Sequence, residues 1–177
     1  MAAENQQSAK QWPTTIYNLL KQGGVRQVAY VPDSGHKQLI QHCTDDPDIR
    51  TVSLTTEQDG IGMAAGAWLG GVKSTLLMQS SGVGNCINAL SLIENCRFPF
   101  LTFVTMRGDF GESNNWQIPM GQAVEPVLSA MGMICLRVER EEDMEETVAA
   151  ALRMAFLGSQ SIAVLLSQRL VGAKIFK

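Results

Sequence analysis

The chain has 177 residues, enough for one domain with a sizeable core, and 45% of them are hydrophobic and 18% charged. Its 14 Lys and Arg against 17 Asp and Glu give a net charge of −3 without a basic cluster, which argues against nucleic acid or an anionic membrane as a partner. The polar start lacks a signal-peptide core, and no apolar run approaches membrane-spanning length. The cysteines (Cys43, Cys86, Cys96 and Cys135) form no metal or disulfide pattern, so we expect a cytoplasmic protein with reduced thiols.

Strand and helix patterns alternate after residues 1–12, which we expect to be a mobile tail ahead of a single domain at 13–177. Apolar runs predict six strands at 25–31, 49–54, 74–79, 99–105, 133–138 and 162–166. Helical spacing predicts helices at about 13–22, 36–43, 85–95, 124–130 and 141–157, and one in the first half of 55–85. Residues 80–85 are expected to turn, and 106–122 to form a long loop of the kind that is usually functional. The alternation predicts an α/β fold, a doubly wound six-stranded parallel sheet with helices on both faces.

The stretch 55–85 combines a helix, a strand and a carboxylate. Gly60, Gly62 and Gly66 lie within the helix, where each costs about 1 kcal/mol relative to Ala, a cost tolerated where a partner or ligand approaches closely. Glu57 begins this helix after one strand, and the turn 80–85 follows the next. The carboxyl ends of parallel strands meet at one edge, so we expect Glu57 and this turn to lie together at a ligand site. A charge that merely stabilises the helix start is the alternative role for Glu57.

Common nucleotide-binding motifs do not fit the chain. The turn after the first strand is PDSG rather than GxGxxG, and no GxxxxGK[ST] is present. Ser34 and His36 share that turn, yet no Ser–His–Asp set can be assembled, and helix capping is the more ordinary role for a polar residue there. However, PDSGH, TTE, QSSGVGN and MRGDFGE all follow predicted strands, which places them on one edge of the sheet.

Taken together, these motifs resemble the pyrimidine-binding (PYR) domain of thiamine-diphosphate enzymes. The resemblance extends from about residue 13 to residue 172 and includes VPDS, TTEQDGIGMAAGAWLGG, SSGVGN, and RGDFGE followed by QIPMGQA. Within this superfamily the chain is most similar to the separate α subunit of sulfopyruvate decarboxylase and to its relative phosphonopyruvate decarboxylase. The PYR domain chiefly serves the cofactor, so the motifs specify thiamine diphosphate more closely than the substrate.

The resemblance implies roles for individual residues. Glu57 matches the glutamate that hydrogen-bonds N1′ of the aminopyrimidine and so promotes loss of the thiazolium C2 proton. Other positions match the cofactor border: Thr56, Gln79, Ser80, Ser81, Gly82 and Asn85. On the substrate side, Ser34 matches a position that faces the substrate, and His36 is a further candidate in the same turn. Arg107 and Gln117 match a mobile loop over the site that also holds Gly111, Glu112 and Met120. His36 departs from the family pattern and is open to three interpretations: a substrate contact, a proton shuttle or an exposed side chain.

The family binds the diphosphate through Mg²⁺ with a GDG motif followed by Asn in a second domain, and this sequence lacks that motif. We therefore expect no metal ligand on this chain and a β subunit that carries the diphosphate-binding (PP) domain, in an α2β2 or larger hetero-oligomer. The expected activity is decarboxylation of a 2-oxo acid with an anionic tail, active only with that partner. Two alternatives remain: another thiamine-diphosphate carboligase or lyase, and a non-catalytic regulatory relative. An intact Glu57 argues against the non-catalytic relative.

Overall fold

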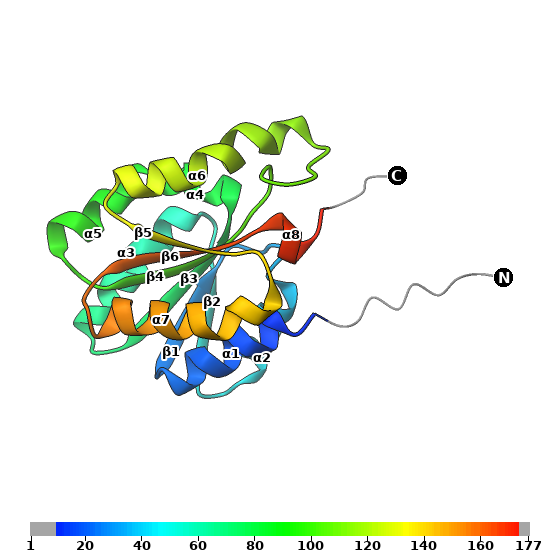
Figure 1. The fold of residues 1–177 in the computed structure, drawn as a ribbon. Coiled ribbons are helices and arrows are strands. Elements are labelled where there is room, and N and C mark those ends of the chain that lie inside the picture. The colour runs from blue at the N-terminus through cyan, green and yellow to red at the C-terminus, as the bar shows by residue number, and fades with distance from the viewer. Residues whose placement is uncertain (1–9, 174–177) are drawn as a thin grey trace.

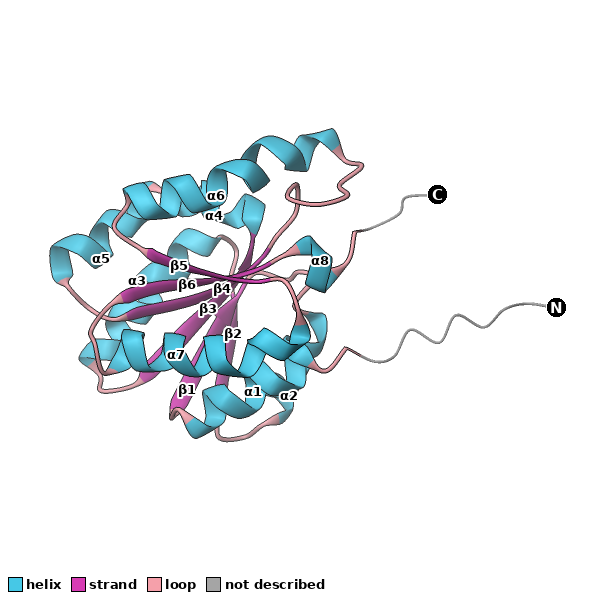
Figure 2. Cartoon of the chain, viewed as in Figure 1, coloured by secondary structure: helices cyan, strands magenta, loops and turns pink. Residues whose placement is uncertain are grey.

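The computed structural model describes residues 10–173. Its strands are β1 (Val25–Tyr30), β2 (Arg50–Ser53), β3 (Lys73–Gln79), β4 (Phe100–Thr105), β5 (Ile134–Val138) and β6 (Ser161–Leu166). Its α-helices are α1 (Trp12–Gln22), α2 (Lys37–Asp45), α3 (Glu57–Leu69), α4 (Ser80–Cys86), α5 (Ser91–Cys96), α6 (Ile118–Ala130), α7 (Met144–Phe156) and α8 (Gln168–Val171). Short 3₁₀ turns occupy Asn88–Leu90, Asn115–Gln117 and Glu141–Asp143. Figures 1 and 2 show these elements as a sheet between two helical layers.

The six strands form one parallel sheet in the order β2-β1-β3-β4-β6-β5. One core lies between the sheet and α1, α2 and α7, and the other between the sheet and α3, α4, α5 and α6 (Figure 1). All six residues of β4 are buried, as expected for a strand covered on both faces. The predicted doubly wound sheet is confirmed, and every strand bound agrees with the prediction to within one residue.

The strand order reverses between β1 and β3, because β2 lies on one side of β1 and β3 on the other. Parallel sheets bind ligands outside the carboxyl ends of the strands at such a reversal point. The segments that leave β1, β3 and β4 meet there, and we call this edge the rim. It contains Asp33, Gln79, Thr105 and Arg107.

Two predicted irregular segments are wrong in part. Residues 80–85 do not turn the chain back but form α4, whose Val83 and Cys86 are buried in the core beneath α3. The loop after β4 ends at residue 114, because α6 begins at Ile118 with Pro119 in its first turn, where a missing N–H costs nothing. The expected helix at 85–95 is likewise divided among α4, a 3₁₀ turn and α5.

The N-terminal part of the chain is only partly described. The expected tail lies mostly outside residues 10–173, but Trp12 is the buried first residue of α1. Lys10 bonds the main-chain oxygens of Leu170 and Val171, which ties the start of the described chain to its end. None of the helices between residues 10 and 173 combines the length and the apolar character needed to cross a bilayer. All four cysteines are free thiols.

Two glycines of α3 provide a matched test of its packing. A Cβ on Gly60 would lie 2.5 Å from Leu76 Cδ1 in the core, whereas a Cβ on Gly62 would meet nothing within 4 Å. We expect Gly62→Ala to raise the free energy of unfolding by about 1 kcal/mol, the helix-propensity difference. Gly60→Ala gains the same propensity but overpacks the core at a cost of about 1–3 kcal/mol, so it should destabilise. Urea unfolding of both variants measures this, and equal effects would contradict the packing.

Candidate active site

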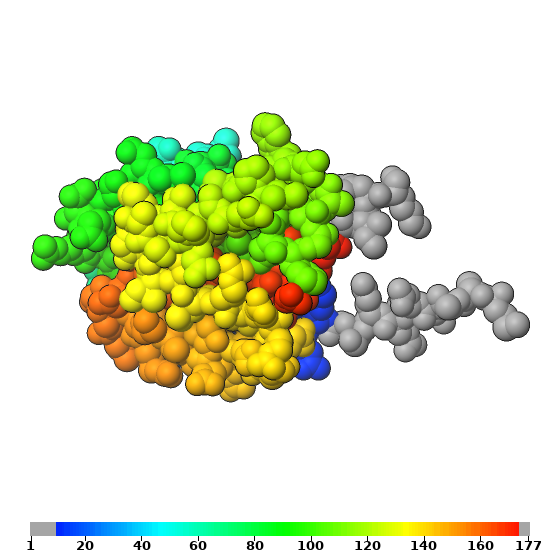
Figure 3. Space-filling view, turned by 45° about the horizontal axis from the view of Figure 1, so that its top comes forward, coloured from blue at the N-terminus to red at the C-terminus, as the bar shows by residue number. Residues whose placement is uncertain are grey.

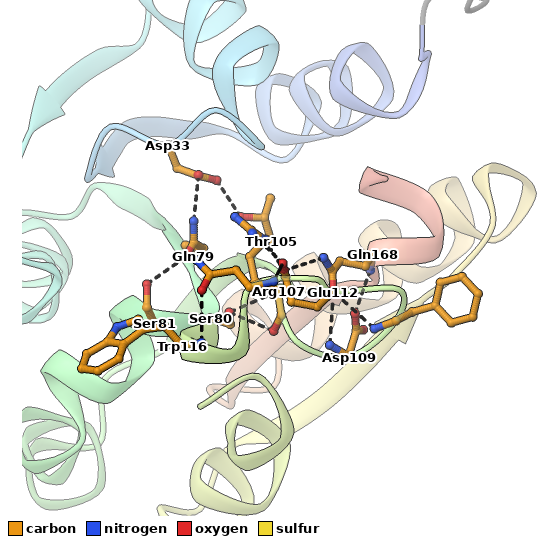
Figure 4. Close-up of polar contacts among 12 residues, drawn as sticks. Asp33, Gln79, Ser80, Ser81, Thr105, Arg107, Asp109, Glu112, Trp116 and Gln168 are labelled. Atoms are coloured by element: carbon orange, nitrogen blue, oxygen red, sulfur yellow. Dashed lines mark hydrogen bonds and ion pairs between the residues drawn. The ribbon is translucent and has the colours of Figure 1, made fainter. Parts of the chain in front are cut away.

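Asp33 is the polar centre of the rim (Figure 4). It follows β1, and its carboxylate accepts hydrogen bonds from Gly35 N at 3.0 Å, Thr105 Oγ1 at 2.8 Å and Gln79 Nε2 at 3.1 Å. These bonds join the ends of β1, β3 and β4. Asp33 was not among the predicted site residues, although the PDSG segment was, because a sequence does not indicate which side chain of a turn points to its neighbours.

Glu57 is the first residue of α3, and its position is fixed from two sides. The residue is 6% exposed, and its Oε2 accepts a hydrogen bond from Asn85 Nδ2 at 3.0 Å. A Cβ on Gly82 would lie 2.3 Å from Glu57 Oε1, so only glycine allows α4 to approach the carboxylate this closely. Oε1 forms no hydrogen bond with a described residue. The structure therefore holds a shielded carboxylate with one oxygen left to accept a bond.

The predicted cofactor-border residues divide into two groups in the structure. Glu57, Gly82 and Asn85 form one cluster. Cys86 of α4 lies near this cluster, and burial together with the Glu57 carboxylate raises the pKa of its thiol to about 12. Ser80 is fully buried, where its hydroxyl donates to Arg107 O and accepts from Arg107 N. The exposed Ser81 donates to Gln79 Oε1, and the half-buried Thr56 precedes Glu57 as the N-cap residue. α4 thus connects the Glu57 cluster to the rim.

Arg107 and Glu112 form a bidentate ion pair in the loop after β4. Arg107 Nε lies 2.6 Å from Glu112 Oε2, and Arg107 Nη2 lies 2.9 Å from Glu112 Oε1. Their side chains are only 10% and 2% exposed. The hydrogen bonds from Arg107 lower the pKa of the Glu112 carboxyl to about 2, and the same pairing raises the pKa of Arg107. Glu112 therefore stays ionised at neutral pH.

The loop that carries this pair is anchored to the C-terminal part of the chain. Gln168 of α8 bonds Asp109, Phe110 and Glu112, and Arg137 of β5 bonds Asp109 at 2.9 Å. In the space-filling view, α8 (red) is visible as a small patch between the green and yellow segments, consistent with the 1% exposure of Gln168 (Figure 3). Sequence reasoning missed Gln168, because no motif or helical period marks the four residues of α8.

The remaining predicted substrate residues lie apart from one another. His36 is fully buried, with Nε2 at 3.2 Å from both Met78 O and Phe103 O, so its interpretation as an exposed side chain is wrong. Burial lowers the pKa of His36, against the opposing charge of Asp33, which favours the neutral ring donating through Nε2. Ser34 is exposed along a hollow of about 1030 Å³ lined also by Lys37 and Arg169. Gln117 is half-buried beside the start of α6, and no described residue bonds its buried Oε1.

Among residues 10–173, no group of three or more His, Cys, Asp or Glu side chains is placed to hold a metal ion. The rim and the Glu57 cluster are instead held by hydrogen bonds between side chains.

A doubly wound α/β domain whose shielded Glu57 carboxylate keeps one oxygen free among the described residues, beside the strand-order reversal, has the arrangement of an open-sheet ligand-binding domain. Residues 13–125 match the family model of the thiamine pyrophosphate enzyme, N-terminal TPP binding domain. The chain belongs to this family, which confirms the predicted resemblance to the PYR domain.

The sequence similarity to individual relatives covers most of the chain. The chain is 34% identical over 152 residues to the sulfopyruvate decarboxylase subunit alpha of Methanococcus maripaludis, covering 85% of this chain and 91% of that protein. It is 33% identical to the subunit of the same name from Methanocaldococcus jannaschii, over 85% of this chain and 89% of that protein. A phosphonopyruvate decarboxylase of Streptomyces viridochromogenes is 36% identical over 73% of this chain, which matches 33% of that longer protein.

The fold also matches a solved structure. A 2-oxoglutarate:ferredoxin oxidoreductase from Magnetococcus marinus superposes with a TM-score of 0.75 at 18% identity, over 90% of this chain and 29% of that chain. At this identity the match supports the fold alone.

The buried His36 should make stability depend on pH. Burial lowers the pKa of His36 in the folded chain, so the unfolded chain binds more protons. The contribution of the neutral His36 ring to the free energy of unfolding is therefore present above about pH 6.5 and is lost as the pH falls toward the folded-state pKa. Over that window wild-type stability should fall by up to about 1.4 kcal/mol per pH unit, and His36→Gln should flatten the slope. Denaturant unfolding between about pH 7.5 and about pH 5.5 measures this, with His42→Gln as control for the loss of an imidazole. Equal slopes for wild type and His36→Gln would refute it.

Proposed function

We propose that this chain is the pyrimidine-binding subunit of a thiamine-diphosphate-dependent decarboxylase that acts on a 2-oxo acid with an anionic tail. The single observation that carries the proposal is the Glu57 carboxylate, shielded in a domain of this family with one oxygen unpaired among the described residues. The names of the relatives support the reaction and the substrate class, since they are sulfopyruvate and phosphonopyruvate decarboxylases.

The Glu57 cluster fits the aminopyrimidine end of the cofactor. Asn85 holds Oε2, so the carboxylate is oriented before any ligand arrives, and Oε1 remains to accept a bond from a protonated ring nitrogen. Gly82 keeps the approach free of a side chain, and the buried Ile61 and Ala64 of α3 help to exclude water. A charge-assisted hydrogen bond is stronger in such a shielded setting than in water. When bound, thiamine diphosphate supplies a thiazolium ring that accepts the electron pair released as CO₂ leaves a 2-oxo acid.

Arg107 is the candidate for the anionic tail of the substrate. Its Nε and Nη2 bond Glu112, while Nη1 has no hydrogen-bond partner within residues 10–173. A planar guanidinium suits sulfonate or phosphonate oxygens better than an ammonium group does. Ser34, His36 and Gln117 stay proposals for the substrate side, and burial restricts His36 to an indirect role in this conformation.

A second subunit completes the proposed enzyme. The relatives that this chain covers to about nine-tenths are named alpha subunits, which supports a separate β subunit. We assign the diphosphate and Mg²⁺ site to the PP domain of that subunit, in an α2β2 or larger assembly.

Glu57→Gln tests the cofactor role. The change is nearly isosteric, so the fold should persist, but the weaker acceptor should slow exchange of the cofactor's C2 proton by about 10²–10⁴-fold, the usual range for acid–base catalysis. Proton NMR on the chain reconstituted with its co-purifying partner measures the rate. Asp59→Asn, which removes an exposed acid of the same helix, is the matched control and should exchange at the wild-type rate. Exchange of the C2 proton at the wild-type rate in Glu57→Gln would refute the cofactor role of Glu57.

Arg107→Ala tests the substrate class. Losing one charge-assisted contact costs about 1.5–3 kcal/mol, so kcat/KM for sulfopyruvate should fall roughly ten- to a hundredfold more than for pyruvate, whose tail is a methyl group. Arg137→Ala is the control, because it removes a cation that anchors the same loop through Asp109 without touching Arg107. The control should affect both substrates alike, and equal losses in Arg107→Ala would defeat the anion-tail role.

A further inference from the structure

Gln168 is the residue through which the C-terminal part of the chain holds the loop after β4. It is 1% exposed at the start of α8, and its partners Asp109, Phe110 and Glu112 lie 56 to 59 positions earlier in the sequence. Its main-chain N donates to Asp109 Oδ1 at 3.1 Å. Its side-chain Oε1 accepts from Asp109 N and Phe110 N, both at 3.2 Å, and its Nε2 donates to Glu112 Oε2 at 2.9 Å.

This pattern fixes the orientation of the Gln168 amide. The oxygen faces two main-chain N–H groups and the nitrogen faces a carboxylate, so the flipped amide would lose every bond. The same pattern fixes Glu112, whose Oε2 accepts from Gln168 Nε2 and Arg107 Nε, while Oε1 accepts from Arg107 Nη2 and Asn114 N. Four donors leave the Glu112 carboxylate no freedom to rotate.

Arg107 in turn depends on Glu112. The bidentate pair directs two nitrogens of the guanidinium toward Glu112, which determines where Nη1 points. Main-chain bonds between Arg107 and Ser80 Oγ fix the backbone of Arg107 but not its side chain. The side-chain direction is therefore set by a relay from Gln168 to Glu112 to Arg107 (Figure 4).

We propose that Gln168 is a positioning residue for substrate specificity, because its amide orients Glu112 and thereby directs the free N–H donors of Arg107 toward the substrate's anionic tail. The substrate part of this inference rests on the proposed function, whereas the relay itself does not. The charged groups that face Gln168 are Glu112, paired with Arg107, and Asp109, paired with Arg137. Arg169 lies next in sequence and stacks on Phe110.

An isosteric substitution separates positioning from simple packing. In Gln168→Glu, an ionised carboxylate would face Glu112 where the amide donated a bond, so the repulsion would push Glu112 away from Arg107. Once protonated, the carboxylic acid offers the same arrangement as the amide, with an oxygen for the two N–H groups and an O–H for Glu112. Gln168→Glu should therefore lose the relay at high pH and regain it at low pH, whereas Gln168→Ala should lose it at both.

The experiment uses two readouts on the full chain. The first is hydrogen exchange of Arg107 Nε–H, followed by nitrogen-resolved NMR and assigned from its disappearance in Arg107→Lys. We expect at least about tenfold faster exchange than wild type in Gln168→Glu at about pH 8 and recovery toward the wild-type rate by about pH 5.5, since one of two carboxylates that share a site takes up its proton well above the usual range. Gln160→Glu, an exposed glutamine, is the matched control and should match wild type throughout.

The second readout is the ratio of kcat/KM for sulfopyruvate to kcat/KM for pyruvate in the reconstituted enzyme. At about pH 8 the ratio should fall in Gln168→Glu and in Gln168→Ala, and lowering the pH should restore it in Gln168→Glu alone. Wild-type Nε–H exchange in Gln168→Glu at high pH would overturn the relay, and faster exchange with an unchanged ratio would overturn its link to specificity. If the wild-type enzyme does not turn over sulfopyruvate, the proposed substrate fails, while the exchange readout still decides the relay.

Discussion

Burial of charge at the rim is the constraint on which the arrangement of this domain depends. The half-buried Asp33 and the buried side chains of Glu57, Glu112 and Arg107 lie where strands of the sheet end, and an unpaired buried charge there would cost several kcal/mol. The surrounding elements supply the donors. Gln79 and Thr105 satisfy Asp33, Asn85 bonds Glu57, and Gln168 and Asn114 join Arg107 around Glu112. Asn85 of α4 and the main-chain N of Asn114 in the loop after β4 thus each serve a buried carboxylate.

Glu57 and Glu112 are both shielded from water, but their carboxylates accept different numbers of hydrogen bonds from the chain, which gives them different roles. Glu112 accepts four hydrogen bonds from the chain, and its pKa of about 2 keeps it charged, so it has no capacity left for a ligand. Glu57 accepts one such bond among the described residues and retains an oxygen beside Gly82. A carboxylate held at one oxygen and free at the other is prepared for a ligand that donates a proton or a hydrogen bond. Position in the sequence does not distinguish these roles, but the count of donors does.

Features of this domain that depend on local interactions could be predicted from the sequence, and features that depend on contacts between distant residues could not. The strands were placed to within one residue because apolar runs between turn residues are local signals. The α4 helix was missed because SSGVGNC contains poor helix formers, and the burial of Val83 and Cys86 and the close approach of Gly82 to Glu57 are tertiary contacts that local propensity does not encode. Glu57, Gly82 and Asn85 were predicted together from the motifs and do form one cluster. The burial of His36 and the contacts of Gln168 join residues distant in the sequence, and no local pattern encodes them.

The residues proposed for cofactor binding and for substrate choice depend on different parts of the chain. The match to the family model covers residues 13–125, which contain Glu57, Gly82 and Asn85 and therefore every contact of the carboxylate cluster. Arg107 and Glu112 also lie within that range, but the amide that orients their ion pair belongs to α8, outside it. Strand β6 carries α8 to the rim, since β6 pairs with β4 up to Thr105↔Leu166, two residues before Arg107. A change in α8 can thus alter the direction of Arg107 while every bond to Glu57 stays in place, so under the proposed function one cofactor site would serve substrates with different tails.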